Sequence, residues 1–260
     1  MRASRRHPQL ASKHEGARSA RRVLVKGNLL ENVWLDAQTG FAVNLKSANQ
    51  DGGAPWSQTS DVTFKNNLVR HAANAVTVVA RDPHTQLATE RVTIGNNLFE
   101  DINDSWGGRH SGKFLQVVSA TAPAGVTPTG PADLVVVHNT GITTGTTIDV
   151  DAPPSEGFVF NDNLVGHGHY GVKGSDSSTG TPTLETFFPG YRFSRNALVA
   201  GRANLYPPGN FFPATWADVG FVDLAGGDYH LRPDSPYAGA GHGGTDVGAD
   251  IDALEAALGG

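Results

Sequence analysis

Three cationic side chains of this sequence could take part in acid–base chemistry: Lys46, Arg81 and Lys113. A polysaccharide lyase needs a cation beside the uronate carboxylate and a base that removes the neighbouring α-proton. Carboxylates such as Asp51 and Asp82 could hold calcium, a cation that prefers oxygen ligands. These residues make lyase chemistry one hypothesis, with calcium as its cofactor.

Aspartates support a second chemistry. A glycoside hydrolase uses two carboxylates, one as acid and one as base or nucleophile, about 5 to 9.5 Å apart. Asp82, Asp101 and Asp104 are the best candidates. Across both hypotheses the catalytic candidates are Lys46, Arg81, Asp82 and Asp104, and we expect Arg81→Ala or Asp82→Ala to abolish turnover without unfolding the protein.

Two tryptophans, Trp56 and Trp106, lie in polar stretches rich in Gly, Ser and Asn. An indole ring beside hydrogen-bonding groups suits a sugar, which has apolar faces and a rim of hydroxyls. A non-catalytic binding surface would need only these groups. The polar residues expected to contact the sugar are Asn44, Asn49, Arg109, Lys113 and Gln116.

Each of these features also has a purely structural interpretation. Arg81 and Asp82 could form a local ion pair where a strand ends before Pro83. The tryptophans could pack their loops onto the body of the protein. Asp149 and Asp151 flank one residue, and they could be a solvated pair or calcium ligands.

A repeated pattern organises the elements that must position these side chains. Two apolar residues stand two positions apart, and an Asn follows three positions after the second. The clearest copies read VTFKNNLVRHA, VTIGNNLFEDI and FVFNDNLVGHG. The repeated residues are Asn28, Asn67, Asn97, Asn139, Asn163 and Asn196, at spacings of 39, 30, 42, 24 and 33.

This pattern predicts a β-solenoid. Apolar residues two apart face one side of a strand, and Asn suits the turn that follows because it tolerates a left-handed backbone. Asn residues stacked at the spacing between strands form ladders. Self-similar units with insertions of variable length indicate a solenoid, whereas a β-sandwich has no need of the same Asn after every other strand.

The six units resemble coils of the right-handed parallel β-helix, the pectate-lyase-like superfamily. The stretch DYHLRPDSP at 228–236, followed by DVGAD at 246–250, is similar to the closing segment of many secreted bacterial β-helix proteins. The resemblance implies an all-β, right-handed parallel β-helix whose site lies on an outer strand face walled by loops. The long insertions after Leu45, Ile102 and Val118 would wall one such face.

The chain departs from the catalytic motifs of that superfamily. Residues 32–36, NVWLD, resemble the Trp-x-Asp-His stretch of pectate lyases, but Ala37 stands where the His belongs. The sequence also lacks the Asp-Asp pair of polygalacturonases and the Arg-x-Pro-x-x-Arg motif of lyases. No family's catalytic residues can therefore be transferred to this chain.

Composition sets further bounds. The chain has 260 residues, of which 32 are Gly and none is Cys, so disulfides and Cys-based metal sites are excluded. The net charge is −5, and Lys and Arg cluster only within the first 22 residues, which argues against a nucleic-acid partner. No apolar run reaches the roughly 20 residues of a membrane span.

The expected organisation has three parts. Residues 1–20 are disordered or form an incomplete first coil, residues 21–201 form the β-helix, and residues 202–260 form a closing segment with one short helix at 250–258. The aromatic stretch after residue 201 should cover the last coil. The absence of an obvious N-terminal cap suggests the C-terminal portion of a longer protein, and an open first coil predicts association through its edge.

These observations predict an extracellular or cell-surface protein that binds or cleaves a polysaccharide. The alternative is a non-catalytic structural or adhesive module of a larger surface protein. An acid–base pair in one groove would favour the enzyme, and a flat face with scattered charges would favour the module.

Overall fold

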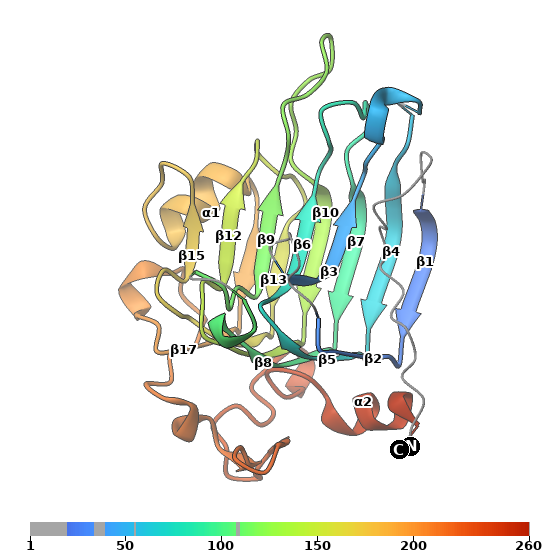
Figure 1. Cartoon of the computed structure of the whole chain (residues 1–260). Helices are drawn as coiled ribbons and strands as arrows, with labels where there is room; N and C mark the ends of the chain where they lie inside the picture. Colours follow the sequence, from blue (N-terminus) through green and yellow to red (C-terminus); the bar gives the residue numbers. More distant parts are fainter. Residues whose placement is uncertain (1–19, 34–39, 55, 108–109, 260) are drawn as a thin grey trace.

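The computed structural model describes residues 20–33, 40–54, 56–107 and 110–259. Three sheets, here called A, B and C, run side by side along the molecule, and the chain visits them in turn, one strand in each per coil. All strand pairs within these sheets are parallel (Figure 1). The protein is a right-handed parallel β-helix, which confirms the predicted fold class.

Sheets A and B have six strands each. Sheet A consists of β1 (Ala20–Lys26), β4 (Thr59–Lys65), β7 (Glu90–Gly95), β10 (Ala132–Val137), β13 (Val159–Asn161) and β16 (Arg192–Ser194). Sheet B consists of β2 (Leu29–Glu31), β5 (Leu68–Ala72), β8 (Leu98–Ile102), β11 (Thr140–Thr143), β14 (Leu164–Gly166) and β17 (Ala197–Val199).

Sheet C has five strands, and each leads through a loop to the next strand of sheet A. They are β3 (Phe41–Lys46), β6 (Asn74–Val79), β9 (Leu115–Val118), β12 (Ile148–Asp151) and β15 (Val172–Gly174). Short 3-10 helices lie in two of the loops beside this sheet, η1 (Gln50–Gly52) and η2 (Asp104–Trp106).

The apolar alternation of the strands creates stacked columns in the core. In sheet A, the second apolar position of the repeated pattern is in register from coil to coil and forms one such column. Phe64 and Phe160 are fully buried there, and the rings of Phe160 and Phe193 stack with centroids 5.3 Å apart. The column consists of Val25, Phe64, Ile94, Val136, Phe160 and Phe193.

The predicted asparagine ladder is present between sheets A and B. The Nδ2 of each Asn donates to the Oδ1 of the Asn in the next coil, at 2.9 to 3.1 Å. Asn210 extends the ladder by one member beyond the six of the sequence pattern. One detail of the prediction is wrong: the left-handed residue is the one before each ladder Asn, such as Asn66 (φ 53°) or Asn96 (φ 51°).

The predicted C-terminal helix is α2 (Ile251–Leu258). The Asp250 side chain caps it by accepting from the Ala253 amide, and Gly259 ends it in the left-handed conformation. A second helix, α1 (Thr181–Phe187), was not predicted from the sequence. This helix has only seven residues and buries mainly Leu184 and Phe187, too short a pattern to show helical periodicity.

The C-terminal strap, defined here as residues 214–259, covers sheet B. It contains η4 (Trp216–Val219), the antiparallel pair β18 (Phe221–Asp223) and β19 (Asp228–Leu231), η5 (His242–Gly244) and α2. Its apolar side chains form a second core with the outer face of sheet B, including Leu164 and Val199. Figure 1 shows the strap, orange to red, lying beneath sheet B.

The aromatic stretch after residue 201 lies against the last coil, as predicted, and the strap that follows it goes further. Phe211 pairs with Ala197 at that end. The strap then returns along the turns between sheets A and B, from Arg195 in the last coil to Gly27 in the first. The strap therefore packs against sheet B, whereas most of the predicted polar site residues lie on or beside sheet C.

Candidate functional site

Polar side chains form a continuous row across the outer face of sheet C. In each strand the inward residue, such as Val76, Leu115 or Ile148, is buried. The residue that follows it in the strand points to the outer face. Because neighbouring strands lie about 4.8 Å apart, four strand spacings give the row a length of roughly 19 Å. Its members, one from each strand and all in register, are Asn44, Thr77, Gln116, Asp149 and Lys173.

Hydrogen bonds connect the middle of this row. Lys113 Nζ lies 2.5 Å from Asp149 Oδ2, and Gln116 Nε2 donates to the same oxygen at 3.2 Å. Thr77 Oγ1 lies 3.4 Å from Gln116 Oε1. The carboxylate of Asp149 is therefore compensated by a cation, and the side chains beside it are held in fixed orientations.

The ends of the row have unused hydrogen-bonding capacity. Asn44 Oδ1 is buried and, within the described part of the chain, accepts no hydrogen bond. Lys46 lies one step further along β3 on the same outer face, and the described residues give it no ion pair. Lys173 donates to the Ser177 carbonyl. Asn44 Oδ1 is enclosed, so Lys46 is the side chain at this end of the row that a polar ligand could reach.

Asp151 follows Asp149 by two residues and is exposed on the same face of β12. Two residues of a strand place their Cα atoms about 7 Å apart. Both carboxylates therefore lie on one strand face, as expected of a solvated pair or of calcium ligands, and the calcium site stays a prediction.

Asp82 lies in the loop after β6 and makes three hydrogen bonds. Its Oδ2 accepts from the Asn49 amide, and its Oδ1 accepts from the amide of His84 and from Thr85 Oγ1. Asn49 is 1% exposed, and its Oδ1 accepts from the Ala54 amide. These two residues hold the loops together and do not face the open surface of sheet C.

Arg81 is also enclosed by the loops, with an exposed fraction of 3%. Its Nη1 donates to the Gln86 carbonyl and its Nη2 to Thr129 Oγ1, at 3.2 and 2.6 Å. Burial lowers the pKa of its guanidinium. Among the described residues Arg81 forms no ion pair, so neither a local pair with Asp82 nor an exposed catalytic cation describes its position.

The two tryptophans lie at opposite ends of the sheet C strands. Trp56 is 64% exposed in the loop that follows β3. Trp106 precedes β9, stacks on His71 of sheet B with ring centroids 4.9 Å apart, and donates from Nε1 to Asp101. Asp104 is exposed beside it in η2. The structure therefore does not bring the tryptophans or the catalytic candidates into one cluster.

Several predicted residues share the face, and others do not. Asn44, Lys46, Lys113 and Gln116 lie along sheet C, whereas Arg109 lies outside the described residues. Sequence patterns did not identify Lys173 as a site residue, and they did not indicate that Asp149 pairs with Lys113. The alternation around Lys173 spans only three strand residues, and the Lys113–Asp149 pair joins positions 36 residues apart.

The described residues contain no group of three or more His, Asp or Glu side chains placed to hold a metal ion. Across the same residues, no helix is long and apolar enough to cross a membrane.

The fold assignment rests on the sheet topology, and the candidate site rests on the register and contacts of sheet C. In comparisons with protein-family models, with curated proteins and with solved structures, nothing matches this chain.

Proposed function

We propose that the outer face of sheet C binds an extended polysaccharide. The observation that carries this proposal is the in-register polar row, which spans five strands and includes an amide, a hydroxyl, a carboxylate and an ammonium group. A polymer with repeated hydroxyls can donate to and accept from such a row over several sugar units. The exposed ring of Trp56 at one edge supplies an apolar platform for a sugar face.

Fixed side-chain orientation favours recognition. Gln116 and Lys113 are already bonded to Asp149, so few rotamers are lost when a ligand binds. The proposal includes secretion or display at the cell surface, where polysaccharides are accessible, and membership of the pectate-lyase-like superfamily. The three-sheet coil with its asparagine ladder supports that membership.

A binding assay with matched variants tests the proposal. Affinity electrophoresis through gels containing acidic or neutral polysaccharides should retard the wild-type chain in at least one gel. The variant Gln116→Leu keeps side-chain volume and removes the amide at the centre of the row, so affinity should fall about tenfold. Thr63→Val, on sheet A, is the control and should bind as the wild type does.

Cleavage is a second candidate, favoured by the Asp149–Asp151 spacing. Incubation with the same polysaccharides, with and without calcium, would follow the absorbance of unsaturated products and the release of reducing ends. Calcium-dependent absorbance would indicate a lyase, and reducing ends alone would indicate a hydrolase. Asp149→Asn should then abolish turnover while Arg81→Met retains it, because Arg81 lies enclosed in the loops.

A folded wild-type chain that neither binds nor cleaves any polysaccharide of the panel would contradict the proposal. The non-catalytic structural or adhesive module would then be preferred, because it needs only the solenoid and its strap.

A further inference from the structure

The first coil has an open edge, and this edge is separate from the polar row of sheet C. Within the described residues, β1, β2 and β3 each pair with a strand on one side only. The other end of the solenoid is covered by α1 and by the stretch around Phe211. An unpaired strand edge presents free amide and carbonyl groups that can pair with another chain.

Apolar exposure accompanies the open edge. Val23 and Leu30 are only partly buried, whereas their register partners Val62 and Val69 in the next coil are 2% and 0% exposed. Val25, the next inward residue of β1, is also only partly buried, whereas its register partner Phe64 is 0% exposed. The first coil therefore has the same inward apolar positions as the others, but no strand among the described residues covers them on the open side.

The asparagine ladder is open at the same end. Each Oδ1 accepts from the backbone amide and Nδ2 of the Asn in the preceding coil, as Asn67 Oδ1 does from Asn28. Among the described residues, nothing donates to Asn28 Oδ1. A further strand and turn of the same type would complete this arrangement.

A stack of charged residues on sheet A indicates which charge would suit a strand added next to β1. Four residues at one register position share the left-handed conformation, with φ between 50° and 56°. Their charges alternate along the stack, and Arg91 is ion-paired with Asp61 at 2.6 Å. The column is Arg22, Asp61, Arg91 and Asp133. Gly157 and Gly190 continue the column after Asp133, so the alternation is confined to the first four coils. The Asp61–Arg91 pair shows that a carboxylate fits beside an arginine at this position, which favours a carboxylate beside Arg22.

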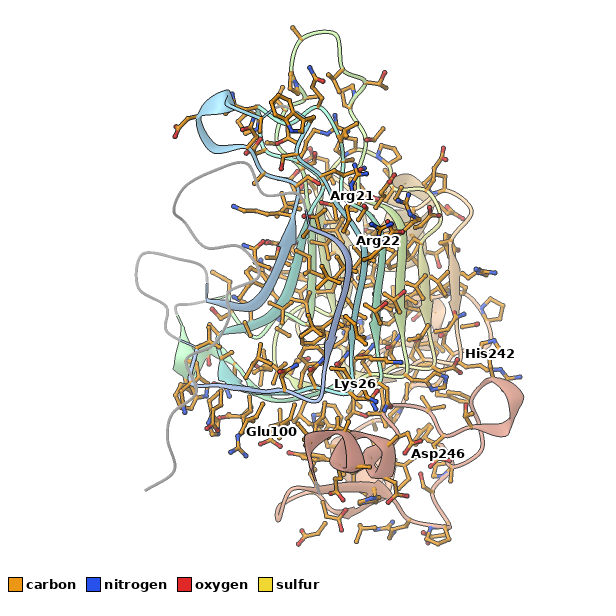
Figure 2. All side chains as sticks on the ribbon, turned by 90° about the vertical axis from the view of Figure 1, so that its right-hand side faces the viewer. Arg21, Arg22, Lys26, Glu100, His242 and Asp246 are labelled. Carbon is orange, nitrogen blue, oxygen red and sulfur yellow. The ribbon has the colours of Figure 1, made fainter. Side chains whose placement is uncertain are left out.

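Nearby charge supports an acidic occupant. Arg21, Arg22 and Lys26 all lie on β1, the strand nearest the viewer in Figure 2. The first 19 residues contain five Lys and Arg and one Glu, so their net charge, 5 − 1 = +4, has the same sign as that of β1. A second copy of the chain docked edge to edge would place two basic strands side by side, which is unfavourable.

We propose that the open edge of β1 binds an acidic, extended segment of another polypeptide, which adds a parallel strand to sheet A. Its apolar residues would alternate so as to cover Val23 and Val25, and its carboxylate would lie beside Arg22. The junction of β4 with β7 is the template, because Asp61 and Arg91 meet there in the same arrangement. Main-chain hydrogen bonds would supply affinity and the carboxylate would supply selectivity.

A peptide copied from the chain itself tests this inference. The acidic probe is residues 57–68 with Lys65 replaced by Glu, and the basic probe is residues 57–68 with Asp61 replaced by Lys. Fluorescence anisotropy with the full-length protein should show binding of the acidic probe only. The variant Arg22→Asp, whose new residue already occurs in this column at Asp61 and Asp133, should weaken the acidic probe about tenfold and bind the basic one.

Two controls separate strand addition from simple attraction of charge. Arg192→Glu changes an exposed residue of β16, at the far end of sheet A, and should leave the affinity unchanged. An acidic probe with alternate backbone nitrogens methylated should bind at least about tenfold more weakly, because it cannot form the ladder.

Four results would overturn the inference. The first two are failure of the acidic probe to bind and equally strong binding of the methylated probe. The other two are failure of the Arg22→Asp variant to bind the basic probe and self-association of the wild type that blocks the acidic probe. The last result would assign the edge to a second copy of the chain.

Discussion

At the scale of single residues, the position before each ladder Asn has two structural roles. It adopts the left-handed conformation that turns the chain from sheet A to sheet B. Four of these residues, Asn66, Asn96, Asp162 and Arg195, also hydrogen-bond to the C-terminal strap. At Gly27, which precedes the first ladder Asn, a Cβ would lie 2.3 Å from the Ala257 carbonyl oxygen, so the close approach of the strap requires glycine there.

The ladder makes a residue-scale prediction. Asn97 is fully buried, donates to Asn139 and Phe64, and accepts from Asn67. Asn97→Ala should lower the free energy of unfolding by roughly 3 kcal/mol, because it leaves buried groups without partners. Asn28→Ala, in the open first coil, should cost only about 1 kcal/mol. Urea denaturation measures both values, and equal losses would show that burial does not set the strength of the ladder.

At the scale of elements, the strap connects successive coils. Its backbone amides bond to Asp162, Thr140 and Asn96 in three different coils, and the Ala253 carbonyl accepts from Asn66 in a fourth. Coils of a solenoid otherwise contact only their nearest neighbours. The strap therefore adds contacts between coils that are not adjacent.

Gly248 is where the strap approaches sheet B most closely. Its φ is +100°, and a Cβ would lie 2.6 Å from Thr140 Oγ1 and 3.1 Å from Leu164 Cβ. Gly248→Ala should destabilise the protein by roughly 3 kcal/mol through combined strain and overpacking. Gly243→Ala is the matched control, since its φ is +68° with open space around it. Its cost should be about 1 kcal/mol, from backbone strain alone. Similar losses in thermal unfolding would rule out the close approach.

His230 should make the stability of the strap depend on pH. Its Nδ1 lies 2.7 Å from Asp228 and its Nε2 lies 3.3 Å from Asp252 of α2. The hydrogen bond to Asp228, with a smaller effect from Asp252, raises the pKa of His230 above 6.5. The protonated ring therefore stabilises the folded state fully below about pH 6.5, and this contribution disappears as pH rises through the raised pKa.

Thermal unfolding of the wild type and of His230→Gln would check the direction of this pH dependence. The wild type should exceed the variant in Tm by more at about pH 5.5 than at about pH 9, because only the charged ring gains from the carboxylates. A difference that is constant with pH would mean that the imidazole contributes through packing alone.

At the scale of the whole molecule, the two ends of the solenoid are unequal. The first coil has exposed edges and partly buried apolar residues, whereas the last is covered by α1 and by residues around Phe211. Hydrogen exchange should therefore be fastest in β1, slow in β7, and slow again in β16, since local opening starts where few contacts are lost. Equal protection of β1 and β7 would indicate that the strap makes the molecule one cooperative unit.

The sequence by itself determined the repeated coil. Apolar residues two apart and an Asn at each turn are local requirements of a stacked strand, so the fold class, the ladder and the inward positions of Val43 and Leu45 were all predictable. The short helix at 250–258 was predictable for the same reason, with Asp250 or Asp252 as its N-cap, and the structure shows that Asp250 is the cap.

Only the tertiary structure decided which polar residues meet. Arg81 and Asp82 follow β6, a strand of sheet C. Arg81 donates to Thr129 and Asp82 accepts from Asn49, and these long-range contacts hold both side chains among the loops. The pairing of Lys113 with Asp149 depends on the length of the insertion between two coils, which no local pattern specifies. The return of the strap to Gly27 is likewise a contact between the two ends of the chain. Apolar alternation indicates whether a residue of a strand points inward or outward. The contacts described here depend instead on how coils of unequal length stack.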